Sequence, residues 1–87
     1  MKVVKQPVDM IAYFNVEGVI MPLKFRLETE DKYLKTIKVL TILYHKEEKI
    51  AGNLIRTYAC TIAQDTLEKP CEIKYELNSC KWFLFKI

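Results

Sequence analysis

Alternation of apolar and polar residues, with a period of two, runs through most of this 87-residue chain. In residues 70–77 (PCEIKYEL) every second residue from Cys71 to Leu77 is apolar, and the residues between them are charged. Such alternation is typical of β-strands that have one buried face and one face in solvent. The backbone is therefore predicted to be extended almost throughout.

Turn-forming residues divide this pattern into six segments. We expect strands over residues 9–16, 19–28, 33–44, 53–63, 70–77 and 81–87, with a turn over residues 64–69 and another at residues 78–79. Residues 33–44 also place apolar side chains at a helical spacing, but their β-branched residues favour a strand. The charged residues 45–50 are expected to form a loop or a single helical turn closed by Gly52.

The first two segments are predicted to form a hairpin around a two-residue loop, Glu17-Gly18, in which the glycine adopts a positive φ. The expected pairs are Phe14 with Met21, Ala12 with Leu23, and Met10 with Phe25, all apolar and on one face. A slip of one residue would invert this arrangement. Pro22 has no N–H, so regular pairing with the third strand is expected to begin only after it.

Six short strands joined by tight turns predict an all-β fold, a small antiparallel meander. One face of the sheet is charged, and no long helix is available to cover the apolar face. The sheet is therefore expected to close into a barrel or a barrel-like sandwich, which also hides its edges. No linker or repeat divides the chain, so residues 1–87 are predicted to be one domain.

The charge balance argues against a surface dedicated to nucleic acid. Lys and Arg number 14 against 11 Asp and Glu, for a net charge of +3, and the basic residues are interspersed with acids. Dedicated nucleic-acid domains cluster their positive charge. No apolar run approaches the roughly 18 residues of a membrane-spanning helix, and the N-terminus lacks the features of a signal peptide. We expect a cytoplasmic protein that does not contact membranes.

The three cysteines are an odd number, and in a reducing compartment they are expected to be free thiols. Cys60 and Cys71 lie opposite each other if residues 65–66 form a two-residue loop. That register makes them a hydrogen-bonded pair, which suits the narrow geometry of a disulfide poorly. With His45, the cysteines lack the close ligand pairs of structural zinc sites, so no metal site is predicted.

No constellation of residues points to catalysis. His45 has no sequence signature that ties it to a Ser or Cys nucleophile. The carboxylates lie in a charged loop or alternate with Lys74 on an exposed strand face, where cross-strand charge pairing explains them. Gly18 and Gly52 are the only glycines, so a glycine-rich phosphate loop is absent. The sequence predicts no catalytic residue and no cofactor.

The last segment, residues 81–87, is apolar on both faces, and only one of them can line a barrel. Trp82, Leu84 and Lys86 share one face, and Phe83, Phe85 and Ile87 share the other. We assign Trp82, Leu84 and Lys86 to a contact with a protein partner or a second copy of the chain. The alternative is weak, salt-sensitive nucleic-acid binding through Lys24, Arg26, Lys74 and neighbouring aromatic rings.

Several short motifs suggest a relationship. They are YELN at residues 75–78 with Cys80-Lys81-Trp82 and Lys86-Ile87, PVDM at residues 7–10 with Phe25-Arg26, and Glu48-Lys49 with Ala51-Gly52-Asn53. Together they resemble a family of short, uncharacterised bacterial proteins over most of the chain. The resemblance implies no catalytic residue, no cofactor, and a complete protein of 87 residues. Residues 30–32 replace a glycine turn of that family, so it does not predict their geometry.

Overall fold

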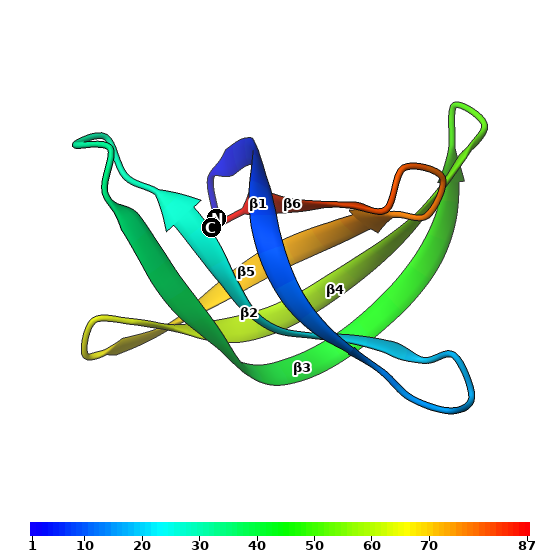
Figure 1. The fold of residues 1–87 in the computed structure, drawn as a ribbon, viewed down its shortest axis with the longest axis horizontal. Coiled ribbons are helices and arrows are strands. Elements are labelled where there is room, and N and C mark those ends of the chain that lie inside the picture. Colours follow the sequence, from blue (N-terminus) through cyan, green and yellow to red (C-terminus); the bar gives the residue numbers. More distant parts are fainter.

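The computed structural model describes all residues, 1–87, and consists of six β-strands (Figure 1). The strands are β1 (Val3–Phe14), β2 (Ile20–Glu28), β3 (Leu34–Ile50), β4 (Asn53–Gln64), β5 (Leu67–Glu76) and β6 (Lys81–Lys86). Each pairs antiparallel with the next, and β6 pairs with β1 to close a barrel. The expected all-β antiparallel barrel is confirmed. The structure holds no helix of the length and apolar character needed to cross a membrane.

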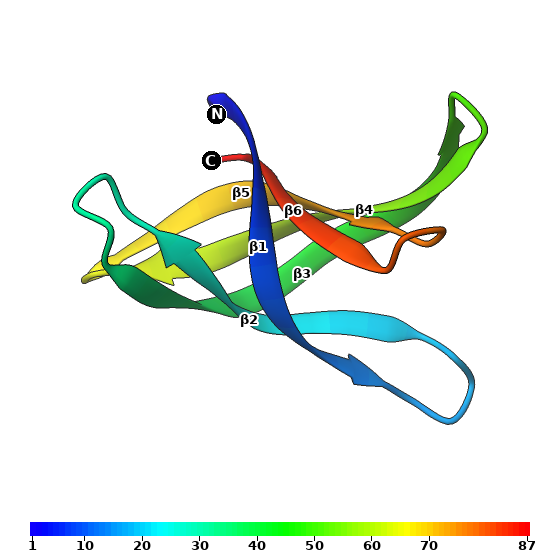
Figure 2. The same cartoon turned by 45° about the horizontal axis from the view of Figure 1, so that its top comes forward.

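The two ends of the chain complete the closure and lie side by side (Figures 1 and 2). The N–H of Lys2 donates to the carbonyl of Ile87 at 2.6 Å, and the N–H of Ile87 donates to the carbonyl of Lys2 at 2.9 Å. Farther along, Val8 pairs with Trp82. Because β6 is hydrogen-bonded on both sides, this strand, which is apolar on both faces, has no free edge.

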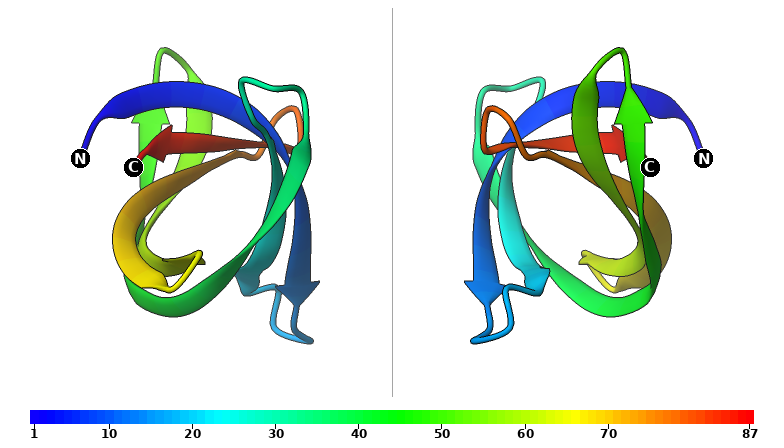
Figure 3. Two further views of the ribbon diagram at one scale, coloured as in Figure 1. Left: turned by 90° about the vertical axis from the view of Figure 1, so that its left-hand side faces the viewer. Right: turned by 90° about the vertical axis from the view of Figure 1, so that its right-hand side faces the viewer.

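The strands, whose barrel is seen end-on in Figure 3, surround a single core. Phe25, Ile37 and Leu84 are among its fully buried side chains. The rings of Tyr75 and Trp82 pack against each other, with 4.5 Å between their centres. Only 13 of 87 residues are buried, as expected for so small a domain, and the core alone therefore supports modest stability.

The hairpin of β1 and β2 departs from the predicted register at one residue. Met10 pairs with Phe25 as predicted, but Ala12 pairs with Pro22 rather than Leu23. Leu23 is the extra residue of a β-bulge, and a bulge shifts the phase of the alternation along the rest of the strand. Pro22 therefore points into the core, whereas Leu23 is exposed.

Phe14 was expected in the core opposite Met21, and this prediction is wrong. It pairs with Ile20 and is 58% exposed. Ile20 still reaches the core, but Phe14 lies where the hairpin end, joined by residues 15–19, begins to project beyond the barrel (Figure 2). The loop is longer than the expected two residues because the Asn15 carboxamide accepts bonds from two N–H groups, those of Glu17 and Val19, both at 2.9 Å. Gly18 has the expected positive φ, +83°.

The seam between β2 and β3 is only partly hydrogen-bonded. Their pairing runs from Lys24 to Glu28 and, as predicted, begins after Pro22. Beyond it, the Tyr58 hydroxyl on β4 donates to the carbonyl of Ile20 at 2.7 Å and connects β2 to the barrel wall. Burial raises the pKa of Tyr58 above its ordinary value, since the neutral hydroxyl is the form that this site accommodates.

Residues 33–44 are extended from Leu34 onward, so the predicted strand is confirmed over a helix. The prediction of a loop or helical turn over residues 45–50 is wrong. The strand β3 continues to Ile50 and forms a long hairpin with β4. Ala51 and Gly52, at φ +49° and +84°, form the turn, and two positive φ values match the twist of a hairpin. The charged residues are tolerated there because they pair across the strands, as Glu47 does with Arg56 at 2.8 Å.

The hydroxyl of Tyr58 gives a direct test of this seam. The variant Tyr58→Phe leaves the buried carbonyl of Ile20 without a donor and is expected to lower the free energy of unfolding by about 1–3 kcal/mol. Tyr33→Phe, at an exposed tyrosine, is the matched control and should change it by less than about 0.5 kcal/mol. Urea denaturation measures both, and equal effects would show that Tyr58 does not bridge the seam.

Candidate functional site

The face of β6 that was predicted to contact a partner lies inside the barrel. Trp82 is 8% exposed and Leu84 is 1% exposed, so the assignment of these two residues to an interface is wrong. The physical reason is closure. Because β6 pairs with both β5 and β1, the face that carries Trp82 and Leu84 is the one that completes the core.

Lys86 does not share that face, because the alternation slips after Leu84. Ile73 pairs with Leu84 and Glu72 pairs with Lys86, which leaves Phe85 as the extra residue of a β-bulge against β5. Lys86 therefore turns outward beside Phe85, and Ile87 packs against the core. The sequence had placed Lys86 with Trp82, and Ile87 with Phe85.

On the other side of β6, β1 has an irregularity at the same level. Val3 pairs with Lys86 and Gln6 pairs with Leu84, so two residues of β1 stand opposite Phe85. One of them, Lys5, adopts a φ of +45°, a left-handed conformation that favours glycine. The slip brings the side chains of Lys5 and Phe85 together on the outer surface.

Three lysines from three strands converge on the Phe85 ring. The ammonium groups of Lys5, Lys74 and Lys86 lie 5.7, 4.4 and 6.0 Å from its centre, within the range of cation–π attraction. A groove of about 200 Å³ opens here. Its lining residues, which define the Phe85 groove, are Lys5, Ile55, Lys74, Glu76, Phe83 and Phe85.

The Phe85 groove carries more positive than negative charge. Glu72 lies 3.8 Å from the Lys74 ammonium and 3.6 Å from that of Lys86, so one carboxylate serves two lysines. Glu76, on the rim, accepts a hydrogen bond from the Ser79 hydroxyl at 2.6 Å. Lys5 takes part in none of the salt bridges. The arrangement is suited to an anion that has an apolar portion.

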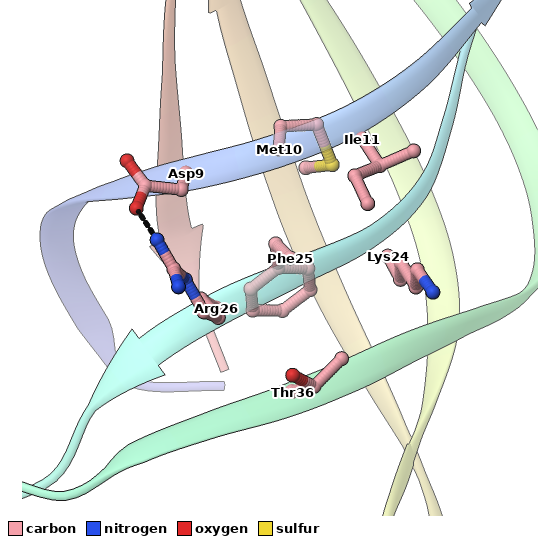
Figure 4. A pocket seen from close by; sticks show the side chains of 7 residues that line it. All are labelled: Asp9, Met10, Ile11, Lys24, Phe25, Arg26 and Thr36. Carbon is pink, nitrogen blue, oxygen red and sulfur yellow. Dashed lines mark hydrogen bonds and ion pairs between the residues drawn. The ribbon is translucent and has the colours of Figure 1, made fainter.

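A second hollow, of about 290 Å³, lies over β1, β2 and β3 (Figure 4). It contains two of the residues predicted for nucleic-acid binding, Lys24 and Arg26. The guanidinium of Arg26 donates to the carboxylate of Asp9 at 2.7 Å, and Figure 4 shows Lys24 extending away from this pair. The charge of Arg26 is thus already balanced.

The structure does not unite Lys24, Arg26 and Lys74. Lys24 and Arg26 are on β2 and Lys74 is on β5, and two strands separate β2 from β5 in either direction around the barrel. Lys74 belongs to the Phe85 groove. Sequence reasoning missed Lys5 and Phe85 as members of this groove because the two register slips that bring them together leave no mark in the local alternation.

Cys60 and Cys71 face each other across β4 and β5, as expected for a two-residue loop at residues 65–66. The turn predicted over residues 64–69 is too long, because β5 begins at Leu67. Their sulfur atoms are 3.2 Å apart, and both residues are 1% exposed. The contact with Cys60 and the burial raise the pKa of the Cys71 thiol far above its ordinary value. The same contact lowers the pKa of Cys60, because the Cys71 thiol can donate to a Cys60 thiolate.

The remaining candidates stay apart. Cys80 is exposed on the β5–β6 turn, and the His45 ring packs against Tyr58 with 5.7 Å between ring centres. No group of three or more His, Cys, Asp or Glu side chains is placed to hold a metal ion. Buried thiols in such a setting behave as small apolar side chains of the core.

Comparison of the chain with models of known families, with curated proteins and with solved structures found no match. The resemblance to a family of short bacterial proteins therefore stays a prediction.

The thiols allow a test of the core. We expect only Cys80 to react rapidly with Ellman's reagent in the native protein, because Cys60 and Cys71 are sealed in the core. Unfolding in urea should then release the two remaining thiols. A single reactive thiol per unfolded chain, in the absence of added oxidant, would mean that Cys60 and Cys71 are bonded to each other.

Proposed function

We propose that this protein is a non-enzymatic self-association module whose contact surface is the projecting end of the first hairpin, residues 11–23, called here the β1–β2 arm. The observation that carries the proposal is the exposure of large apolar side chains along the arm. They are Ile11, Tyr13, Phe14, Val16, Val19, Met21 and Leu23.

Such a concentration differs from ordinary surface exposure. Single apolar residues are common on protein surfaces and need no explanation. Seven of them on one projecting hairpin are typical of a protein contact surface. The bulge at Leu23 contributes to it, because it turns Leu23 outward in place of Pro22.

The arm favours a second copy of the chain as its partner. Glu17 is the only charged residue between residues 11 and 23, so two arms can pack together around a two-fold axis without burying unpaired charges. A net charge of +3 opposes such pairing only weakly. Association also adds apolar burial to a domain whose own core is small.

The proposal moves the contact from Trp82 and Leu84 to the β1–β2 arm and keeps the predicted kind of partner. It includes a cytoplasmic location, where a reducing environment keeps the Cys60 and Cys71 thiols from being oxidised. It assigns no chemistry to His45, whose ring packs against Tyr58 rather than beside a nucleophile.

Sedimentation equilibrium tests the proposal. At about 100 μM, a concentration that detects micromolar dimers, we expect a mass near twice 10.3 kDa for the unaltered chain. Leu23→Lys should return the mass to that of one chain, because it places a charge in the contact. Tyr13→Lys should do the same, and circular dichroism verifies that both variants keep the β fold.

Leu67→Lys is the matched control. Leu67 is also an exposed apolar residue, but it lies beside the β4–β5 turn, at the opposite end of the molecule from the arm (Figure 1). This variant should keep the mass of the unaltered chain. A mass of one chain for the unaltered protein at the same concentration would overturn the proposal, as would dissociation by Leu67→Lys alone.

A further inference from the structure

The Phe85 groove is built by two backbone irregularities that coincide. Phe85 is the bulged residue of β6 against β5, and Lys5 lies where β1 has an extra residue against β6. Uninterrupted alternation after Leu84 would have pointed Lys86 into the barrel. Bulges recur at functional sites because they redirect side chains, and here both add to one outer patch.

The charged side chains in and beside the Phe85 groove carry a net positive charge, because Lys5, Lys74 and Lys86 stand against Glu72 and Glu76. Three ammonium groups lie within 6.0 Å of one ring centre, and Glu72 is the one carboxylate in ion-pair contact with any of them. Lys74 is held in place by the Thr57 hydroxyl, 3.2 Å from its ammonium, and its side chain is only 13% exposed. A negatively charged ligand would reduce the repulsion among these cations.

The groove is smaller than the pockets that enclose small molecules, so it can contact one part of a larger ligand. Its volume of about 200 Å³ is below the about 300–1,000 Å³ of small-molecule pockets. Its apolar surface comes from Phe85, Phe83 and Ile55, so a flat, weakly polar group can lie against it. Because Phe83 pairs with Pro7 on β1 and Lys74 on β5, the surface continues across neighbouring strands.

We propose that the Phe85 groove binds single-stranded nucleic acid without sequence preference, with bases against Phe85 and Phe83 and phosphates on Lys5, Lys74 and Lys86. Proteins that bind single strands in this way combine aromatic platforms with a cationic path for the backbone. An acidic peptide would satisfy the lysines but leave the aromatic surface unused. The groove is separate from the β1–β2 arm, so this activity does not depend on self-association.

Fluorescence anisotropy with a labelled oligothymidylate of about 12 nucleotides tests the proposal, since such single-strand sites span about 4–16 nucleotides. Three phosphate contacts predict a slope of about −2 for the logarithm of affinity against that of salt concentration. Affinity should therefore fall roughly 20-fold between about 50 mM and about 200 mM salt. Phe85→Leu, which keeps an apolar side chain at the bulge, should weaken binding by about 5- to 100-fold.

Lys5→Gly removes one positive charge from the groove with little effect on the fold, because glycine accepts the positive φ of this position. It should reduce the magnitude of the salt slope by about 0.7. Lys24→Gln removes the same charge from β2, at a position that does not line the groove, and should leave both affinity and slope unchanged.

Three results would overturn the proposal. One is the absence of binding at about 50 mM salt and about 100 μM protein, where even nonspecific binding is measurable. Another is an equal loss of affinity in Lys24→Gln and Lys5→Gly, which would show that affinity depends on the net charge of the protein and not on the groove. The third is displacement of the oligonucleotide by polyglutamate at equal charge concentration, which would identify an acidic protein as the ligand.

Discussion

Pairing of the last strand with the first is the constraint on which the rest of this structure depends. A chain of 87 residues without a helix has no second layer to cover the apolar face of its sheet, so the sheet must cover itself. The strand β6 makes this possible because it pairs with β5 and β1, and the bonds between Lys2 and Ile87 extend the closure to the termini. Closure decides which face of every strand is inside.

The β-bulges determine which side chains depart from that arrangement and reach the outer surface. Within a closed barrel, one extra residue moves every later side chain of its strand to the opposite face. The bulge at Leu23 gives the β1–β2 arm an apolar outer surface, and the slips at Phe85 and Lys5 assemble the cationic groove. Both candidate contact surfaces thus lie where the regular pattern is interrupted.

The local sequence pattern was enough to predict the all-β fold class and the presence of six strands. It also predicted that Cys60 can lie opposite Cys71 and that pairing of β2 with β3 begins after Pro22. These depend on alternation, turn length and a missing N–H, which are properties of neighbouring residues. The bulges could not be predicted, since alternation on each side of a slip looks regular.

The burial of Trp82 and the separation of Lys24 from Lys74 could not be predicted either. Both follow from closure, which joins residues at opposite ends of the chain. Nuclear Overhauser spectroscopy tests closure most directly. A closed barrel predicts backbone proton contacts between Val8 and Trp82 and between Gln6 and Leu84, as strong as those between Met10 and Phe25. Contacts within the first hairpin without any between β1 and β6 would show an open sheet and contradict it.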